Sequence, residues 1–486
     1  MKIKEKVWRG NRKGTGFVKL TKIIQNLHLR DQIKVNILGK NSILTTFYAS
    51  LASYKNYVGF YVPQKICSFY KLLGKEVEFE VEKVNGFYTK LGNDGRLYIP
   101  YEIASELQLK LNELVLIKGQ IENLTKTKVC KIKVREKSGK KEYYCIFSLE
   151  FKNKSGLFVI ERKLSKHDLK EPLKSIVKDL DYGILNNHKI VILQHKSELH
   201  INPQIELDDN LFYYLGCYFA DGTRKNTWAI TASTFNQAKF YKEMHERLIL
   251  NPEYNSSYVS ISLKKDQKVN LEEIKKLWER ECNIEVKSVR ARTIIGNSLK
   301  THLYGSFVIR DNRRVTLLYY QRLLDYVISY ITDEKDQKAA LNFICGVLEG
   351  DGSPSARKGG YIIISTNKED VVILQKILRI ADADYSIQRD GNRAYVRLSA
   401  LGLLSKLELI WDKIFTYYPE RRKKFIERFS RIGAVRFITG EQNYCASWVK
   451  SWLRKNGILN ENYELTSKGK RIKNLLKKMI KAFRNK

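Results

Sequence analysis

Two short stretches of the sequence end on an acidic side chain that is followed by glycine. They are Tyr214–Thr223 (YLGCYFADGT) and Phe343–Ser353 (FICGVLEGDGS). Each has the pattern of an apolar helix whose last residue is an aspartate, Asp221 in the first stretch and Asp351 in the second. The C-terminus of a helix already carries about half a negative charge, so a carboxylate at that end is unfavourable unless a cation balances it.

Small residues recur at a spacing of four in both stretches: Gly216 with Ala220, and Gly346 with Gly350. This spacing places each pair on one helix face. A glycine inside a helix costs about 1 kcal/mol relative to alanine, so its recurrence needs a reason. Faces of small residues allow two helix backbones to approach closely. We therefore predict that the two helices pack against each other through these four residues.

Such packing would bring the two helix C-termini to the same place. The carboxylates of Asp221 and Asp351 would converge with helix-terminal carbonyl groups, including those of Ala220 and Gly350. Mg²⁺ prefers carboxylate, carbonyl and water oxygens, and Mn²⁺ is the alternative ion. We predict that these four residues bind the metal. Carboxylates that hold metal ions beside a DNA backbone can support phosphodiester hydrolysis, because the metal activates water and stabilises the leaving oxygen.

Similar elements follow both aspartates and would position them. The segments TWAITAST and NQAKFYKEMHERLIL follow the first, and YIIIST and KEDVVILQKILRI follow the second. Both pairs have the order strand, Ser/Thr turn and amphipathic helix. The helix that carries the second aspartate is expected to begin near Thr332 or Asp333, which are good N-cap residue types.

The segment Tyr385–Ala400 has the pattern of a hairpin that turns at Asp390-Gly391. Strand alternation gives its returning strand two faces. The apolar face, which suits packing on the helices, contains Ala394, Val396 and Leu398. The polar face, which suits phosphates and base edges in a major groove, contains Arg393, Tyr395 and Arg397. A solvated basic strand is the alternative interpretation.

Tyr214–Gly222 and Ile344–Gly352 resemble the paired signature helices of the LAGLIDADG homing endonucleases, in the single-chain form with two copies. The second copy is closer to the family pattern, whereas Phe219 in the first replaces an acidic residue that is common there. The resemblance covers about residues 206–432. It implies an α+β fold in which two pseudo-symmetric αββαββα repeats, 206–330 and 331–432, form a DNA-binding saddle.

The resemblance also implies supporting residues around the metal. Arg224 would contact the phosphate, Ser233 and Thr366 fall where the family often places a residue that orients water, and Lys368 and Arg357 are possible basic substitutes. The residues expected to contact DNA are Arg224, Lys225, Arg389, Arg393, Tyr395, Arg397, Arg421, Arg422, Lys423 and Lys424.

Three further regions flank this core. Within residues 1–122, Tyr57–Val81 and Leu91–Ile117 share the order strand, proline, short helix and strand; the second copy resembles the AbrB-type swapped-hairpin DNA-binding fold. The two copies could pair with each other, and a small α+β module is the alternative. Residues 123–205 form an unassigned β-rich linker domain, whose three histidines lack a metal-ligand spacing. Residues 433–486 resemble part of a winged helix, with a basic helical tail as the alternative.

Composition points to a polyanionic partner. The chain of 486 residues carries a formal net charge of +36. A surface this basic repels itself unless nucleic acid or a similar polyanion neutralises it. The seven scattered cysteines fit a reducing compartment. The absence of a signal-peptide pattern and of a membrane-length apolar run predicts a soluble, cytoplasmic protein without a membrane partner.

Several activities are disfavoured. The sequence has no Walker A, H-E-x-x-H or G-x-S-x-G motif, and it ends without the His-Asn pair needed for intein splicing. The prediction is a Mg²⁺-dependent, site-specific endonuclease of double-stranded DNA whose core acts as a monomer. Two alternatives stay open. One is a catalytically silent, domesticated DNA-binding regulator of transcription or replication, and the other is assistance of RNA splicing.

Overall fold

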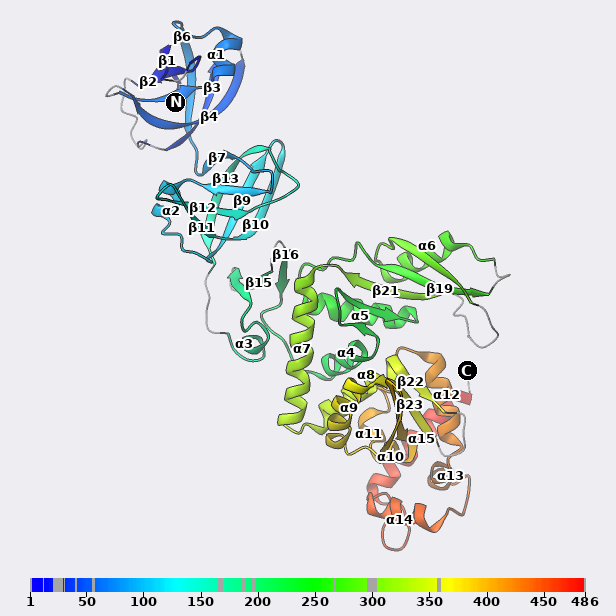
Figure 1. Cartoon of the computed structure of the whole chain (residues 1–486). Coiled ribbons are helices and arrows are strands. Elements are labelled where there is room, and N and C mark those ends of the chain that lie inside the picture. Colours follow the sequence, from blue (N-terminus) through cyan, green and yellow to red (C-terminus); the bar gives the residue numbers. More distant parts are fainter. Residues whose placement is uncertain are drawn as a thin grey trace. The chain divides into compact units, whose positions relative to one another are not determined.

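The protein divides into two compact units, of which unit 1 comprises Met1–Lys166 and Tyr182–Leu185, and unit 2 comprises His167–Asp181 and Asn186–Lys486 (Figure 1). The computed structural model describes residues 2–11, 13–20, 29, 31–39, 42–54, 57–164, 169–185, 189–194, 197–264, 268–294, 304–355 and 360–484.

Unit 1 begins with a closed six-stranded barrel in the order β1-β2-β5-β4-β3-β6. Closure removes the sheet edges that would otherwise be open to pairing with other chains. Val18, Ile33, Phe60 and Phe79 fill its interior and are fully buried. The elements are β1 (Lys2–Arg9), β2 (Gly16–Lys19), β3 (Gln32–Leu38), β4 (Ile43–Tyr54), β5 (Tyr57–Val62), α1 (Gln64–Tyr70) and β6 (Glu76–Lys83).

A second β-rich module follows the barrel and has its own core, in which Phe147 and Phe158 are fully buried. Its sheets have the orders β10-β9-β13-β7 and β11-β12-β8. The elements are β7 (Phe87–Lys90), β8 (Arg96–Ile99), α2 (Tyr101–Glu106), β9 (Leu114–Ile121), β10 (Leu124–Lys131), β11 (Lys133–Lys137), β12 (Lys140–Ile146) and β13 (Ser155–Lys163); β14 (Asp181–Leu185) comes later in the chain.

The predicted order of strand, proline, helix and strand is present in both N-terminal copies, with Pro63 before α1 and Pro100 before α2. The predicted pairing of the two copies is not present in the described residues. β5 pairs with β2 and β4, while β8 pairs with β12. Each copy is thus completed by other strands and has a separate core. The predicted boundary at residue 122 falls in the turn between β9 and β10, which are paired along their lengths.

Unit 2 begins with α3 and the β15–β16 hairpin, followed by two successive α/β halves. The first part contains α3 (Leu173–Ile176), β15 (Lys189–Gln194), β16 (Ser197–Ile201), α4 (Asp209–Asp221), β17 (Gly222–Thr223), β18 (Trp228–Ala232), α5 (Phe235–Leu248), β19 (Tyr258–Lys264), α6 (Leu271–Cys282), β20 (Ser288–Ile294), β21 (Ser306–Asp311) and α7 (Arg314–Asp333). The second part contains α8 (Gln337–Asp351), β22 (Gly352–Pro354), β23 (Tyr361–Asn367), α9 (Lys368–Ile380), β24 (Tyr385–Asp390), β25 (Arg393–Ser399), α10 (Ala400–Leu404), α11 (Leu407–Ile410), α12 (Pro419–Ser430), α13 (Gly433–Thr439), α14 (Ser447–Lys455) and α15 (Ser467–Arg484).

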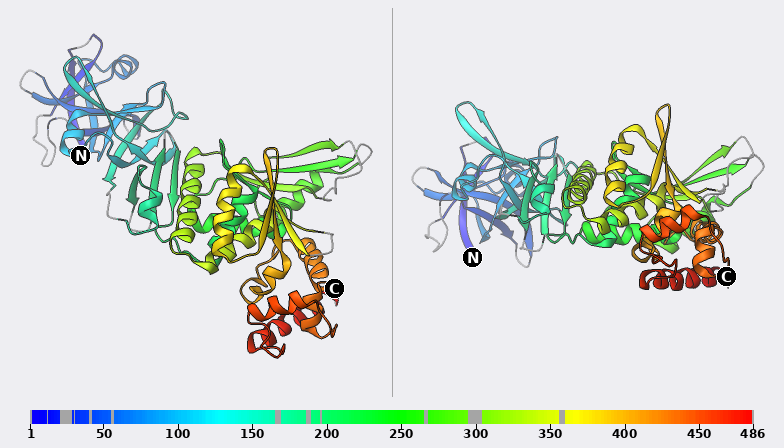
Figure 2. Two further views of the ribbon diagram at one scale, coloured as in Figure 1. Left: turned by 60° about the horizontal axis from the view of Figure 1, so that its bottom comes forward. Right: turned by 90° about the horizontal axis from the view of Figure 1, so that it is seen from below.

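The two halves of unit 2 arrange their strands in the same order. The sheets are β17-β18-β21-β19-β20 and β22-β23-β25-β24, so the first half differs by the extra strand β20 at its end. β20 runs parallel to β19, and α6 connects the two, as a parallel pair requires. Figure 2 shows the yellow β24–β25 hairpin and the green β19–β20 strands projecting on the side away from the red C-terminal helices.

The predicted start of the second helix was wrong. Thr332 and Asp333 are the last residues of α7, and α8 begins after a short break that contains Lys335 in a left-handed conformation. The N-cap of α8 is Asp336, whose side chain accepts a hydrogen bond from the amide of Ala339 at 3.0 Å. Sequence alone favours any of these acidic or hydroxyl residues as caps, and the positive φ of Lys335 selects the later one.

The predicted hairpin turn is displaced by one residue. Asp390 pairs with Arg393, so the two turn residues are Gly391 and Asn392. Gly391 has φ of +55°, which suits a tight two-residue turn.

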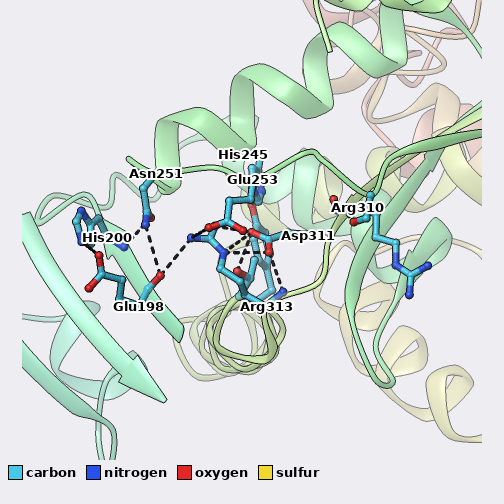
Figure 3. Close-up of polar contacts among 11 residues, drawn as sticks. Glu198, His200, His245, Asn251, Glu253, Arg310, Asp311 and Arg313 are labelled. Carbon is cyan, nitrogen blue, oxygen red and sulfur yellow. Dashed lines mark hydrogen bonds and ion pairs between the residues drawn. The ribbon is translucent and has the colours of Figure 1, made fainter. Parts of the chain in front are cut away.

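A buried ion pair between Asp311 and Arg313 lies in the first half of unit 2, and its arginine also contacts β16 (Figure 3). Asp311 is fully buried and accepts hydrogen bonds from Nε of Arg313 at 3.0 Å. Nη1 of Arg313 also donates to the carbonyl of Glu198 at 3.2 Å. The His200 ring lies 3.4 Å from the Glu198 carboxylate, while His188 and His195 lie outside the described residues.

The C-terminal segment forms α14, a short turn and α15. An Asn-Gly pair ends the first of these helices, because Asn456 is the C-cap of α14 and Gly457 has φ of +68°. Of the strand that a winged helix would have between these helices, the described residues show one bridge, between Leu459 and Leu465. In the described part of the chain, none of the helices combines the length and apolar character needed to cross a membrane.

Candidate metal site at the crossing of two helices

Helices α4 and α8 lie side by side in unit 2 and touch through their small residues (Figure 1). A Cβ atom placed on Gly216 would lie 2.0 Å from the carbonyl oxygen of Phe343. A Cβ atom on Gly346 would lie 1.9 Å from the carbonyl oxygen of Tyr213. Both distances are far below van der Waals contact, so only glycine allows this approach of the two backbones.

The crossing brings the two aspartates together at its end. A Cβ atom on Gly350 would lie 2.9 Å from Oδ2 of Asp221 and 2.7 Å from Cβ of Ala220. Asp351 is the next residue after Gly350 and ends α8, as Asp221 ends α4. Asp221 and Asp351, which come from two distant segments of the sequence, are therefore neighbours, as the spacing of the small residues predicted.

Both acids have raised pKa values. Burial, followed by the negative charges of Asp351 and Glu349, raises the pKa of Asp221 to about 7, against the opposing charge of Arg421. Burial is also the largest cause that raises the pKa of Asp351 to about 6; Arg421 lowers that pKa, and Asp370 raises it. The charged forms are thus poorly solvated and would be stabilised by a cation.

Glu349 is a third acid beside the pair, which the sequence analysis did not select. It is fully buried and accepts hydrogen bonds from the Tyr213 hydroxyl at 2.7 Å and from Nε2 of Gln237 at 3.1 Å. Burial raises its pKa to about 7. Gln237 also accepts a hydrogen bond from the amide of Ser233 at 2.8 Å, which links the predicted Ser233 to this side of the site. The position of Glu349, before Gly350 in the second motif, was the available signal.

Arg421 reaches the same place from α12. Its Nη1 donates to the carbonyl of Glu349 at 2.8 Å and to the carbonyl of Gly350. Its guanidinium lies over the ring of Tyr418, 4.4 Å from the ring centroid. The sequence analysis expected Arg421 to contact DNA as part of the basic patch of residues 421–424, whereas the structure turns it towards the C-terminus of α8.

The other members of that basic patch have different environments. Arg422 donates to the carbonyl of Trp411 at 3.1 Å, and burial lowers the pKa of its guanidinium. Lys423 is exposed, and Lys424 is half-buried. The patch is therefore divided between the interior and the surface.

A small cavity of about 130 Å³ lies beside Asp351 and Ala220. Its lining includes Asp351 and the predicted Thr366 and Arg224. Nη1 of Arg224 donates to Oδ1 of Asp370 at 3.0 Å, and the guanidinium lies 4.8 Å from the ring centroid of Phe219. The side chains from the two halves thus meet in one cavity.

Asp370 is a residue that the sequence analysis missed. It is buried, and besides Arg224 it accepts a hydrogen bond from Nδ2 of Asn367 at 2.7 Å. Asn367 in turn caps α9 through the amides of Glu369 and Asp370. Nothing in the local pattern of α9 distinguishes this aspartate from an ordinary first-turn acid.

The remaining predicted residues lie on the strands and loops around the site. Lys225 and Lys368 are exposed, as are Arg389 and Arg393 on the β24–β25 hairpin, and Arg357 lies outside the described residues. On β25, Tyr395 and Arg397 are half-buried, and the residues of the opposite face, Ala394, Val396 and Leu398, are fully buried, which confirms the predicted alternation.

The first half adds basic strand residues that the sequence analysis did not name. Arg290 and Arg292 are exposed on β20. The Arg290 guanidinium lies 3.6 Å from the centroid of the Tyr258 ring on β19. Both halves of unit 2 therefore carry exposed arginines on projecting strands.

The donors at the crossing fit a hard divalent cation. Two carboxylates and the carbonyls at two helix ends supply oxygen, which Mg²⁺ and Mn²⁺ accept, and the remaining positions would be left to water. Across the described ranges, no group of three or more His, Cys, Asp or Glu side chains is arranged to hold a metal. The fit thus depends on two acids together with backbone oxygens.

Comparison with known proteins gave matches among solved structures alone. No family model matches the sequence, and no curated protein does either. The chain has a weak structural similarity to the homing endonuclease I-DmoI. A complex of I-DmoI with DNA and Mn matches with a TM-score of 0.26 and 13% identity, over 43% of this chain and 98% of that chain. A complex with DNA and Ca matches with a TM-score of 0.24 and 13% identity, over 46% and 91%.

Proposed function

We propose that this protein is a metal-dependent endonuclease that cuts double-stranded DNA at specific sites. The observation that carries the proposal is the pair Asp221 and Asp351 at the touching ends of α4 and α8. Two poorly solvated acids beside two helix C-termini oppose each other unless a cation is bound.

Each group has a role in this proposal. Asp221, Asp351 and the carbonyls of Ala220 and Gly350 hold Mg²⁺ or Mn²⁺. The metal, when bound, would act as a Lewis acid that activates water and stabilises the negative charge on the leaving oxygen. Thr366, which lines the cavity beside Asp351, offers a hydroxyl to orient water. Ser233 and Gln237 form the corresponding polar group of the first half, and Gln237 connects it to Glu349.

The exposed strands would bind the DNA. Arg389, Arg393 and Arg397 lie on one hairpin, and Arg290 and Arg292 on the strands of the other half. A two-stranded ribbon fits the major groove, and arginine can bind phosphate or guanine there. The shared strand order of the two halves supports a LAGLIDADG-type core of two repeats, 206–330 and 331–432, acting as a monomer. Residues 1–122 and 433–486 would make DNA contacts in addition to those of this core.

A catalytically silent DNA-binding regulator is the second candidate, and specific contacts favour it. Arg224 is paired with Asp370, and Lys368 is exposed rather than part of the cavity lining. The basic group that would contact a scissile phosphate is thus not free in this conformation. A DNA-binding protein built on the same scaffold would need no such group.

A nicking assay separates the two candidates. Supercoiled plasmid libraries that carry random inserts would be incubated with the full chain and Mg²⁺, Mn²⁺ or EDTA. We expect cleavage that needs the metal and falls by at least about 100-fold in Asp221→Asn and in Asp351→Asn. Asp382→Asn is the matched control, because Asp382 is exposed and pairs with Lys406. DNA binding without metal-dependent cleavage would instead establish the regulator.

A further inference from the structure

Helix α12 delivers a positive charge to the C-terminus of α8. α12 begins at Pro419, which suits the first helical position, and the preceding Tyr418 is its N-cap. The Arg421 guanidinium stacks on the Tyr418 ring and donates to the carbonyls of Glu349 and Gly350. These carbonyls belong to the last turn of α8, where the helix has free acceptors. The contact is thus both a helix cap and a charge placed at the negative end of a dipole.

This guanidinium uses an oxygen that is proposed to bind the metal. The Gly350 carbonyl is one of the oxygens assigned to the cation, and here it accepts a hydrogen bond from Arg421. A guanidinium cannot be deprotonated in a protein and has no acceptor to offer a metal. Two cations that share one carbonyl repel each other at close distance.

The charge of Arg421 also acts on the whole acidic cluster. It opposes the rise in pKa of Asp221, Asp351 and Glu349. The basic side chain that follows the first aspartate, Arg224, is engaged with Asp370 and leaves this role to Arg421. Arg421 therefore already performs, in part, the electrostatic task that a divalent ion would perform.

We propose that Arg421 is an internal counter-cation that competes with the divalent metal for the Gly350 side of the acidic pair. Metal binding then requires the guanidinium to leave the two α8 carbonyls, and the apparent metal affinity is lower than the oxygens alone would give. The inference rests on the proposed metal site, since it specifies which residue of the chain regulates that site.

The test is Mn²⁺ binding to the full chain without DNA, measured by calorimetry and by the loss of the free-ion paramagnetic resonance signal. We expect Arg421→Gln to bind Mn²⁺ about tenfold more tightly than the natural chain. If the guanidinium occupies the site in most molecules, only the remaining fraction can bind Mn²⁺, and the apparent affinity equals the intrinsic affinity multiplied by that fraction. An unchanged or weaker affinity of a folded Arg421→Gln protein would overturn the inference.

Two controls make the result specific. Arg431→Gln removes the same charge from the end of α12, where Arg431 pairs with Glu427, and its affinity should stay within about twofold of the natural chain because a distant exposed charge is screened. Asp221→Asn should abolish the binding. If none of the proteins shows binding that depends on Asp221, the proposed metal site itself fails, and the inference fails with it.

A second variant, Arg421→Lys, tests the inference if Arg421→Gln does not fold. Arg421→Lys keeps a positive charge but lacks the planar group that reaches two carbonyls. Its Mn²⁺ affinity should lie between those of the natural chain and Arg421→Gln. If Arg421→Gln does not fold, an Arg421→Lys affinity equal to or below that of the natural chain overturns the inference.

Discussion

At the scale of single residues, the α4–α8 crossing of unit 2 concentrates three acids that are poorly solvated. Asp221, Asp351 and Glu349 all have pKa values raised to about 6 or 7, and burial is the largest cause for each. Hydrogen bonds from Tyr213 and Gln237 lower the pKa of Glu349 but do not cancel the effect of burial. The site is electrostatically costly without a bound cation, which is the property that a metal-binding site needs.

This cost predicts how stability depends on pH in the metal-free protein. The folded-state pKa of Asp221 lies above its ordinary value of 3.8, so the folded state binds its proton more tightly than the unfolded state does. Ionisation of Asp221 therefore lowers the free energy of unfolding progressively as pH rises from about 4 to about 7, and the whole loss remains at higher pH. At pH 8 with EDTA, we expect Asp221→Asn to be more stable than the natural chain by about 2–4 kcal/mol.

Urea unfolding at a series of pH values measures this difference. The gap between Asp221→Asn and the natural chain should shrink as pH falls from 8 to 4, whereas Asp382→Asn should follow the natural chain throughout. A gap that stays constant with pH would show that Asp221 is not the group responsible.

At the scale of elements, the crossing of α4 and α8 determines the position of the acidic pair. Backbone contact at Gly216 and Gly346 sets the separation of the helices, and this separation decides whether their C-terminal oxygens can share one ion. The Arg224–Asp370 pair then connects the β17–β18 loop to α9 across the two halves. A small change in the helix separation would thus disturb the cavity and the acidic pair together.

Gly346→Ala tests the contribution of this close approach. The new Cβ would meet the carbonyl oxygen of Tyr213, which belongs to backbone and cannot rotate away. We expect a loss of about 3 kcal/mol in the free energy of unfolding, measured with urea, because overpacking at a backbone contact forces the helices apart. Gly433→Ala is the matched control. A Cβ at that helical position would have no neighbour within 4 Å, so the change should be neutral or stabilising by up to about 1 kcal/mol. Equal effects of the two substitutions would refute close packing as the reason for glycine.

At the scale of the whole molecule, the net charge of +36 dominates the behaviour of the chain towards polyanions. Basic residues are distributed over both units, and the chain has 88 lysines and arginines against 52 aspartates and glutamates. DNA binding by such a surface releases condensed counterions, so affinity falls steeply with salt.

Fluorescence anisotropy with a labelled duplex measures this salt dependence. We expect the dissociation constant to rise by about 10³-fold or more between 50 and 200 mM salt. Arg393→Gln, on the exposed hairpin, should reduce the slope of log K against log salt by about one. Lys239→Gln removes an equal charge from α5, where the lysine pairs with Glu281, and should leave the slope unchanged. A salt-independent affinity would contradict DNA binding through the strands.

The sequence by itself determined the features that depend on local spacing. The two acidic helix ends, the small-residue faces and the alternation of β25 follow from periodicities of 3.6 and 2 residues, which short stretches express fully. Tertiary structure alone decided which distant side chains join them. Arg421 lies 72 residues from Glu349, and 146 residues separate Arg224 from Asp370. Arginines and aspartates of this kind are common on helix surfaces, so their local pattern contains no signal. Their roles arise only when the fold removes water around them and leaves a specific opposite charge or carbonyl within reach.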